Sequence, residues 1–449
     1  MGQDIHELVG SLDGLHMHNL PDDLTNLVVA MRVDINSPVN SDGMITDNAK
    51  IRAYKEDITW LTQRGAKVLV LSHQGKEGES DFISLEQHRR VLSDILFNVV
   101  KFVDHYKADL KAEIGAMKAG EVMLLDNIRR SVDETKDVIG DAHCNSEIAR
   151  KLKEVAHIYI QNAFATIHRN HASMVAPPYE IPAFVGNSLV NEFKALEKIL
   201  DDDASSRMFI IGGGKVKDGV KYVKGILDSG IAGKVFIGGL IGNVFLIAEG
   251  KSIGKETEAF TEKYAKEIPN VKEMLASHRD RIILPMDVAV SRGKNREEYG
   301  VDHIPKEASA LDIGPKTAEM LSRELKEVKS VIMRGPLGKI EEPIFNIGTR
   351  FVLEELARRG IYTVLAGGHT QRIAEELGVA EKLPGYKCTG GGALVTAATG
   401  MELPGIEAVQ KNSKRSEAFL TSLQNMQKLG NLGRKEGMVV SARPKSRNY

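Results

Sequence analysis

Short apolar runs alternate along the chain with longer stretches in which apolar residues recur at helical spacing. The apolar runs lack polar alternation, which is typical of strands covered on both faces. We expect such strands at 27–33, 67–71, 122–125, 157–160, 208–211, 235–237, 282–284, 330–333 and 362–365, and helices at 191–200, 316–328 and 349–359. This alternation predicts an α/β fold with parallel sheets. This number of strands is too large for one compact core, so we expect two sheets.

One connection is marked by prolines at 177, 178 and 182. Gly186 follows, and then a helical run at 187–200 that ends in three aspartates. We interpret this region as a loop leading into a linking helix between two domains. An ordinary surface loop is the alternative.

Composition narrows the class of protein. Apolar residues make up 42% of the chain, charged residues 27%, and the net charge is −1, so we expect no binding to nucleic acid or membranes. Only two cysteines are present, which argues against disulfides and cysteine-based zinc sites. No apolar run reaches the ~18 residues of a membrane helix, and the N-terminus lacks the pattern of a signal peptide. We therefore expect a cytoplasmic protein and a monomer.

Basic residues dominate after residue 410. We interpret 411–449 as a solvated tail in which a short helix covers about 416–428. An arm that binds nucleic acid or a partner is the weaker alternative.

Glycines cluster where the second-half strands end. They occur at 212–214, directly before Lys215, at 238–239 and at 367–368. Ligands of open α/β sheets bind at the carboxyl ends of strands, and glycine allows close backbone approach. We expect a nucleotide site there, although neither a P-loop nor a G-x-G-x-x-G motif is present. Lys215 would reach a phosphate as a point charge.

A further glycine run, Gly390–Gly392, precedes a stretch of small residues that reads as a helix. Free amides at a helix N-terminus bind anions, most often phosphate. A flexible hinge is the alternative.

The first half carries cations at successive strand ends. Asp34 and Asn36 follow Arg32 at the first strand, His73 and Lys76 follow the second, Arg129 follows the third, and Arg169 the fourth, while Lys50 and Arg52 follow a turn at 41–43. Converging basic side chains are typical of a site for a small, multiply anionic metabolite. His168 and His171 have the spacing of metal ligands, but no carboxylate or cysteine lies nearby in sequence, so we expect no protein-bound metal.

An anion pocket in one domain and a nucleotide site in the other predict phosphoryl transfer in a cleft closed by domain movement. A carboxylate acceptor is already ionised and needs no general base. The reaction then needs in-line approach and positive charge on the moving group. The candidates for that charge are Lys50, Arg52, Lys215 and the amides of Gly390, Gly391 and Gly392.

At this point the motifs resemble the phosphoglycerate kinase family, particularly its archaeal members. They are RVDINSP (32–38), LSHQG (71–75), LLDNIR (124–129), NAFATIHR (162–169), GGGKV (212–216), FIGGL (236–240), DIGPKT (312–317), RGPLGKIEE (334–342), GGHT (367–370) and TGGGA (389–393). The resemblance runs from about residue 27 to 409 and keeps the family's motif order.

The resemblance implies two Rossmann-like domains with parallel sheets joined by a linking helix. The expected boundaries are a phosphoglycerate-binding domain at 1–186, the linking helix at 187–204, a nucleotide-binding domain at 205–390, a segment returning to the first domain at 391–410, and the basic tail. It also implies transfer between 1,3-bisphosphoglycerate and ADP, with Mg²⁺ carried by the nucleotide.

Carried over by motif, the substrate pocket comprises Asp34, Asn36, Lys50, His73, Lys76, Arg129 and Arg169. The nucleotide site comprises Gly213, Lys215, Gly238, Gly335, Pro336, Glu341 at the ribose, and Gly367, Gly368, His369 and Thr370 near the phosphates. The glycines at 390–392 meet the phosphoryl group in transit.

Several positions depart from the family pattern. Lys50 and Lys76 stand for arginines, Asn162 for an acidic residue, Arg334 for an asparagine, and His369 for an aspartate that holds Mg²⁺. A lysine keeps the charge but loses the planar bidentate fork. Two alternatives therefore remain, a kinase of another carboxylate and a weakly catalytic nucleotide-binding regulatory protein.

Overall fold

The computed structural model describes residues 4–293 and 295–428, which form two compact units. One, the N-terminal unit, comprises residues 6–193 and 402–428 of the described chain. The other, the central unit, comprises residues 4–5, 194–293 and 295–401. The chain crosses between them within α9 (Asn187–Leu200) and again at 401/402. This division falls after α17 (Gly391–Ala398). The return to the first domain at 391–410, which the resemblance implies, stays a prediction.

The N-terminal unit is built on a six-stranded parallel sheet in the order β3-β4-β2-β1-β5-β6. Its strands are β1 (Val28–Arg32), β2 (Lys67–Leu71), β3 (Val100–Val103), β4 (Val122–Leu125), β5 (Ile158–Gln161) and β6 (Ala183–Val185). Its helices are α1 (Ile5–Leu12), α2 (Ala49–Arg52), α3 (Lys55–Gln63), α4 (Glu86–Leu96), α5 (Leu110–Gly115), α6 (Glu147–Val155), α7 (Ala172–Val175), α8 (Pro177–Glu180), α18 (Pro404–Lys411) and α19 (Ser413–Lys428). Strand β1 is buried along its whole length, as the absence of polar alternation predicts.

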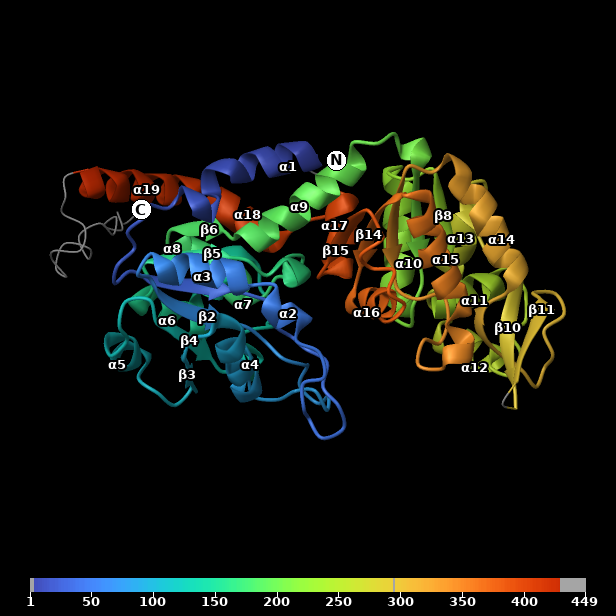
Figure 1. Cartoon of the computed structure of the whole chain (residues 1–449), viewed down its shortest axis with the longest axis horizontal. Coiled ribbons are helices and arrows are strands. Elements are labelled where there is room, and N and C mark those ends of the chain that lie inside the picture. Colours follow the sequence, from blue (N-terminus) through green and yellow to red (C-terminus); the bar gives the residue numbers. More distant parts are fainter. Residues whose placement is uncertain (1–3, 294, 429–449) are drawn as a thin grey trace. The chain divides into compact units, whose positions relative to one another are not determined.

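Helix α19 packs onto this unit (Figure 1). Phe419 and Leu423 belong to its hydrophobic core. The Ser416 hydroxyl donates to the carbonyl of Ala183 at 2.7 Å and accepts from the amide of the same residue at 2.8 Å. The described part of the expected tail is therefore a helix with one face packed on the unit and the other exposed, rather than a wholly solvated segment. The tail beyond 428 lies outside the described residues.

The central unit holds a second six-stranded parallel sheet in the order β15-β14-β13-β7-β8-β9. Its strands are β7 (Arg207–Ile211), β8 (Lys234–Ile237), β9 (Ile282–Ile283), β13 (Ser330–Arg334), β14 (Tyr362–Ala366) and β15 (Gly385–Cys388). Its helices are α10 (Val216–Ser229), α11 (Gly239–Ala248), α12 (Thr257–Lys263), α13 (Ile268–Ser277), α14 (Pro315–Glu324), α15 (Ile347–Arg359), α16 (Gly368–Glu376) and α17. The expected α/β class with two parallel sheets is confirmed.

The central unit also contains a three-stranded antiparallel sheet that the hydrophobic pattern did not predict. It consists of β10 (Asp287–Arg292), β11 (Asn295–Gly300) and β12 (Ser309–Ile313) in the order β11-β10-β12. Strand β11 reads NREEYG, which is polar throughout. Charged side chains are typical of an exposed edge strand, and they remove the apolar signal on which the prediction depended.

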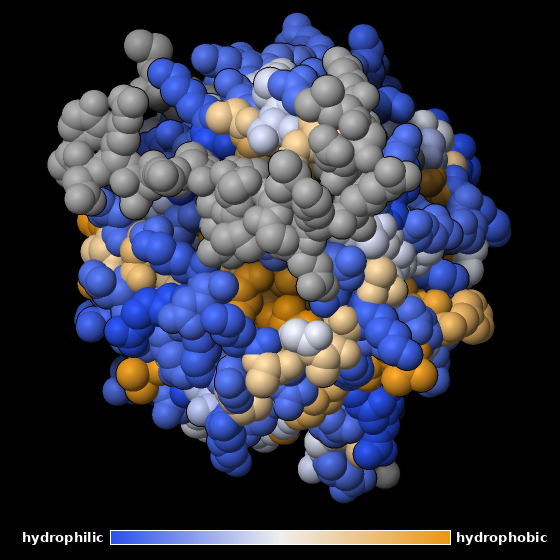
Figure 2. Space-filling view, turned by 90° about the vertical axis from the view of Figure 1, so that its left-hand side faces the viewer, coloured by the Kyte–Doolittle hydropathy of each residue, from blue (hydrophilic) through white to orange (hydrophobic). Residues whose placement is uncertain are grey.

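Hydrophilic side chains predominate on the face seen in Figure 2, with small apolar patches and one apolar hollow between them. Exposed apolar side chains include Phe97, Val99, Val132 and Ile139. Within residues 4–293 and 295–428, no helix combines the length and the apolar character that a membrane crossing requires.

Candidate active site

Four neighbouring strands of the N-terminal unit, β4, β2, β1 and β5, bring their carboxyl ends to one edge of the sheet. Polar residues follow each of these strands, as the sequence predicted. Four basic residues at this edge, which we call the cation cluster, are Arg32, Lys50, Arg129 and Arg169. Each of them lowers the pKa of His73, so all four lie close enough to act on one imidazole.

Arg32 is fully buried at the end of β1. Its Nε donates to Ser173 Oγ at 2.9 Å, and one Nη donates to the Val33 carbonyl. The other Nη lies 3.2 Å from Nδ1 of His73. Because a guanidinium only donates, His73 Nδ1 must accept and the imidazole proton is on Nε2.

His73 is held in its neutral form. Burial lowers the pKa of this imidazole well below its usual value, and Arg32, Arg129, Arg169 and Lys50 lower it further. Its Nδ1 lies 3.9 Å from Asp34 Oδ1, too far for a hydrogen bond. His73 therefore offers a ligand a neutral N–H donor at Nε2.

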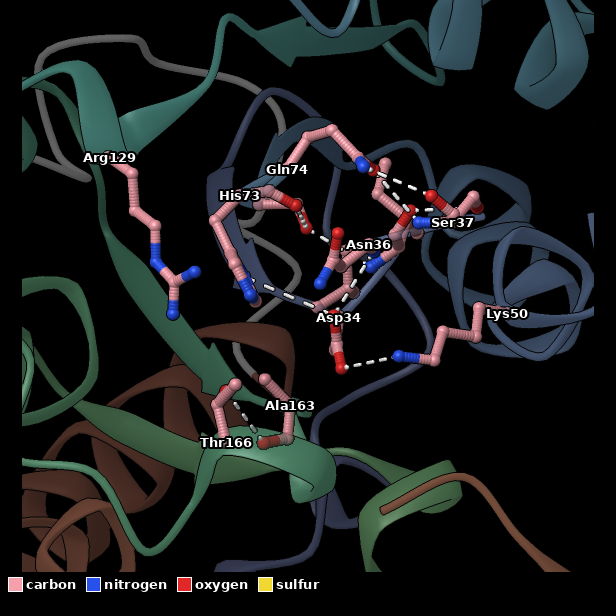
Figure 3. Close-up of polar contacts among 12 residues, drawn as sticks. Asp34, Asn36, Ser37, Lys50, His73, Gln74, Arg129, Ala163 and Thr166 are labelled. Carbon is pink, nitrogen blue, oxygen red and sulfur yellow. Dashed lines mark hydrogen bonds and ion pairs between the residues drawn. The ribbon is translucent and has the colours of Figure 1, made fainter. Parts of the chain in front are cut away.

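Asp34 faces Lys50, whose Nζ lies 3.2 Å from Asp34 Oδ2 (Figure 3). Burial alone would raise the pKa of Asp34, but Lys50, the Asn36 amide and Arg32 together lower it, so the carboxylate is ionised. Asn36 also accepts the Gly75 amide at 3.1 Å. The Lys50 side chain is 28% exposed and the Asp34 side chain 4%. Lys50 therefore lies between the buried Asp34 carboxylate and the solvent.

Arg129 lies on the opposite side of His73 from Lys50 (Figure 3). It donates to the Gly75 carbonyl at 2.5 Å, and its buried Nε has no hydrogen-bond partner among the described residues. Burial, Arg169 and Arg32 lower its pKa to about 10. Arginines that oppose one another in this way are stabilised by an anionic ligand.

Glu134 is the second carboxylate that acts on this group, and its oxygens accept from the amide and hydroxyl of Ser173 at 2.9 and 2.7 Å. Burial raises its pKa, against the effect of Arg32. Nδ1 of His171 lies 3.8 Å from this carboxylate. Burial, Arg129 and Arg169 lower the pKa of His171 to about 2, so this pair is not an ion pair at neutral pH. Positive charge is therefore in excess over the two carboxylates.

Lys76 differs from the other expected substrate residues. It is exposed in the loop after β2, and its ammonium makes no hydrogen bond or ion pair with any residue in the described ranges. The structure therefore brings together Asp34, Asn36, Lys50, His73, Arg129 and Arg169, but not Lys76.

Asn162, the departure from an acidic motif residue, contributes to the framework. Its Nδ2 donates to Asp57 at 2.6 Å, and its Oδ1 accepts the Leu189 amide in the first turn of α9 at 3.0 Å. Asp57 also accepts from the amide and hydroxyl of Ser188 at 2.9 and 2.8 Å. An aspartate at 162 would place two carboxylates in contact, so the asparagine fits this arrangement.

Two framework residues beside the site were not predicted. Asn127 accepts the Gln74 and Arg129 amides at 3.2 and 3.1 Å. Gln74 in turn accepts the Ser37 amide at 2.8 Å and donates to its carbonyl at 3.0 Å. Both lie within motifs that carry the family resemblance, close to a predicted site residue. Their place in these motifs is the sequence feature that could have identified them.

In the central unit the glycine turns stack on one another at the carboxyl edge of the sheet. The Gly213 amide donates to the Pro336 carbonyl at 2.7 Å. A Cβ at Gly212 would lie 2.3 Å from the same oxygen, and a Cβ at Gly239 would lie 2.8 Å from the Gly213 nitrogen. These glycines allow three turns, after β7, β8 and β13, to pack backbone against backbone.

A pocket of about 480 Å³ opens beside these turns, a volume typical of small-molecule sites. Gly213, Pro336 and Glu341, which the sequence indicated, line it. Its further lining includes Asn243, Phe260, Val288, Ala310, Leu311 and Asp312. Several of these come from β10 and β12, so they were missed together with the antiparallel sheet.

The remaining expected nucleotide residues surround neighbouring turns rather than this pocket. Lys215 is the N-cap of α10. Gly335 has a φ of +81°, and its amide donates to Thr370 Oγ1 at 2.9 Å. Gly238 is the N-cap of α11, Gly367 is the N-cap of α16, and Gly368 is its first residue. The side chain of His369 lies outside the described part of the structure.

The predicted small-residue helix exists as α17, with Gly390 as its N-cap. A Cβ at Gly391 would lie 2.9 Å from the Ala366 carbonyl, so α17 begins directly against the end of β14. The Gly390 amide donates to Cys388 Sγ at 3.4 Å. Helices α16 and α17 thus start side by side at the carboxyl edge, where amide groups lack helical partners.

A parallel α/β unit with a ligand pocket at glycine turns, and another with an excess of buried cations, define the chain as a phosphotransferase of the two-unit α/β class. The family model described as phosphoglycerate kinase matches residues 18–401. The chain belongs to the phosphoglycerate kinase family, whose members transfer a phosphoryl group to a carboxyl acceptor.

Known proteins of the family are similar over most of their length. A phosphoglycerate kinase of Methanopyrus kandleri is 35% identical over 386 residues, 86% of this chain and 95% of that protein. One from Haloarcula marismortui is 33% identical, over 85% and 96%. The crystal structure of the Pyrococcus horikoshii enzyme has a TM-score of 0.81 at 30% identity, over 90% of this chain and all of that one.

Proposed function

We propose that this chain catalyses reversible phosphoryl transfer between 1,3-bisphosphoglycerate and ADP, which yields 3-phosphoglycerate and ATP. The observation that carries this proposal is the cation cluster, in which Arg32, Lys50, Arg129 and Arg169 act on one neutral histidine. The carboxylates of Asp34 and Glu134 offset part of this positive charge. A small acid with phosphate and carboxylate groups supplies the missing negative charge.

Each substrate residue has a chemical role in this proposal. Arg129 and Arg169 bind phosphate or carboxylate oxygens through charge-assisted hydrogen bonds. His73 donates from Nε2, while Asp34 and Asn36 accept from the hydroxyl group of the acid. Lys76 is exposed on its loop and contributes by attracting the anion rather than by a fixed contact.

The nucleotide occupies the central unit. We assign the nucleoside to the pocket lined by Gly213, Pro336 and Glu341, near Gly238 and Gly335. The phosphates then lie at Lys215, Gly367, Gly368, His369 and Thr370. Mg²⁺ arrives as part of the nucleotide substrate.

Transfer itself needs positioning and positive charge rather than a base, because the acceptor carboxylate is already ionised. Lys50 neutralises charge at the acceptor end, and Lys215 does so on the nucleotide. The amides at Gly390, Gly391 and Gly392 receive the oxygens of the moving phosphoryl group. Since the two substrates bind different units, we propose that reaction requires domain closure, which also excludes water.

Turnover of purified protein with ATP, Mg²⁺ and 3-phosphoglycerate, coupled to consumption of the acyl phosphate, tests this function. We expect kcat on the order of 10 s⁻¹ or more. The rival function, a kinase of another carboxylate, is favoured by Lys50 in place of an arginine and by the exposed Lys76. Turnover of a different phosphorylated acid, with none of 3-phosphoglycerate, would establish that rival.

We also propose that the enzyme is a cytoplasmic monomer. Size-exclusion chromatography with light scattering tests the oligomeric state.

A further inference from the structure

Arg334 ends β13 near the centre of the central sheet. In register it lies between Ile211, the last residue of β7, and Ala366, the last residue of β14. A glycine turn follows each of these neighbours, at 212–214 and at 367–368. Arg334 is therefore flanked on both sides by the turns that lead into α10 and α16.

The guanidinium of Arg334 has few partners for a largely buried charge. It stacks over the ring of Tyr222 on α10 at 4.5 Å from the centroid, and its buried Nε has no hydrogen-bond partner in the described structure. No carboxylate of the described residues lies within 4.0 Å of it to form an ion pair. Burial lowers its pKa, against opposing effects of Tyr222 and Asp218.

Another arginine at the opposite end of this sheet shows what a structural role requires. Arg207 begins β7 and is almost fully buried. Its guanidinium donates to four backbone carbonyls, those of Ile199, Leu200, Asp202 and Ile231. A buried arginine that serves only the framework is satisfied in this way. In the described structure the Arg334 guanidinium donates to no backbone carbonyl, and its Nε has no hydrogen-bond partner.

The surroundings indicate what the missing partner is. The Arg334 side chain lies on the sheet face that carries α10, and α10 packs against α17. Both helices begin at the carboxyl edge, capped by Lys215 and Gly390, and helix N-termini attract anions. The pocket assigned to the nucleoside is not lined by Arg334, so the anion belongs beyond the Gly335–Pro336 turn.

We propose that Arg334 binds the phosphate chain of the nucleotide. This inference rests on the proposed nucleotide site and deepens it. The planar guanidinium pairs with two phosphate oxygens at once, and Tyr222 holds it in place. An asparagine, which the family resemblance predicts at this position, supplies no charge, so this chain carries a cation in its nucleotide site that the motif does not imply.

The test compares binding of adenosine, AMP, ADP and ATP by isothermal titration calorimetry in the wild type and in Arg334→Met and Arg334→Lys. We expect Arg334→Met to weaken ADP and ATP binding 10- to 100-fold while adenosine affinity changes less than twofold. Arg334→Lys should fall between, because it keeps the charge but loses the fork. Arg323→Met, an exposed arginine of α14, is the matched control and should bind all four as the wild type does.

Equal losses for adenosine and ADP, or unchanged ADP affinity, would overturn the proposal. If Arg334→Met does not fold, the comparison is made with Arg334→Lys, and an ADP affinity identical to that of the wild type again overturns it. Because the readout is binding, this result decides the role of Arg334 whatever acid the enzyme phosphorylates.

Discussion

The cations at the edge of the N-terminal sheet differ in how many donors they keep for a ligand. The guanidinium of Arg32 donates to Ser173, Val33 and His73, so its main effect is to fix the tautomer and charge of His73. The ammonium of Lys50 donates one hydrogen bond to Asp34, which leaves two N–H donors for a ligand. Arg129 keeps an unpartnered buried Nε. Arg169 acts on the same imidazole, and its guanidinium makes no hydrogen bond or ion pair with any described residue. Ligand binding should therefore depend most on Lys50, Arg129 and Arg169, and Arg32 should act through His73.

Lys50→Ala tests the residue whose side chain departs from the family's arginine. The change removes the cation beside Asp34, and we expect kcat to fall about 10²- to 10³-fold, the cost of losing one electrostatic donor in a transition state. Lys50→Arg should retain activity and lower the KM for the acid, because the fork binds two oxygens. Steady-state kinetics with both substrates varied measures the two effects.

Lys107→Ala, an exposed lysine of the same unit, is the control for loss of a positive charge and should leave kcat unchanged. Full kcat in the Lys50→Ala enzyme would remove Lys50 from the catalytic role assigned to it.

At the scale of elements, the apolar pattern predicted the parallel strands that are buried on both faces, such as β2 and β4. It missed the edge strands β3, β6 and β15 of the parallel sheets. It also missed all three strands of the antiparallel sheet, of which β11 is polar along its length. An edge strand of this kind is defined by its pairing with β10, and pairing is not encoded in the strand's own hydrophobicity. Missing that sheet also hid part of the pocket.

The site was predictable where residues directly follow strands, because strand ends meet at one sheet edge. Supporting groups were not predictable in this way. Glu134 meets Ser173, which is distant in sequence, and Asn162 meets Asp57. Such contacts arise from tertiary packing, so no local pattern identifies them.

Gly391→Val tests the start of α17. A Cβ at this position would lie 2.9 Å from the Ala366 carbonyl and 3.2 Å from the Gly367 nitrogen, so the side chain must displace the helix start from the end of β14. We expect kcat to fall by about 100-fold, as for loss of an oxyanion donor, with a smaller effect on nucleotide affinity. Kinetics and calorimetry with ATP separate the two.

Gly300→Val on β11 is the matched control, since a Cβ there meets only His303 at 3.7 Å. If Gly391→Val kept kcat and lost ATP affinity instead, α17 would hold a static phosphate rather than the group in transit.

At the scale of the whole molecule, the N-terminal unit buries several neutral histidines. In the N-terminal unit, burial lowers the pKa of His88 and of His105 to about 4 and that of His171 to about 2, and it lowers that of His73 well below its usual value. In an unfolded chain these groups titrate near 6.5. The unfolded state therefore binds more protons than the folded state between about pH 6.5 and 4.

It follows that the N-terminal unit loses stability as the pH falls through this window, because folded pKa values below the unfolded value favour unfolding by acid. A pH of 5.5 is one unit below the pKa of an unfolded histidine. At that pH, each such histidine lowers the free energy of unfolding by about 1 kcal/mol. Trp60, the only tryptophan, lies on α3 of this unit, so its fluorescence reports this unit's unfolding. We expect the urea midpoint to be lower at pH 5.5 than at pH 7.5, and His88→Gln to reduce that difference. An unchanged midpoint would mean that these histidines are protonated in the folded protein, and His73 would then meet its ligand as a cation.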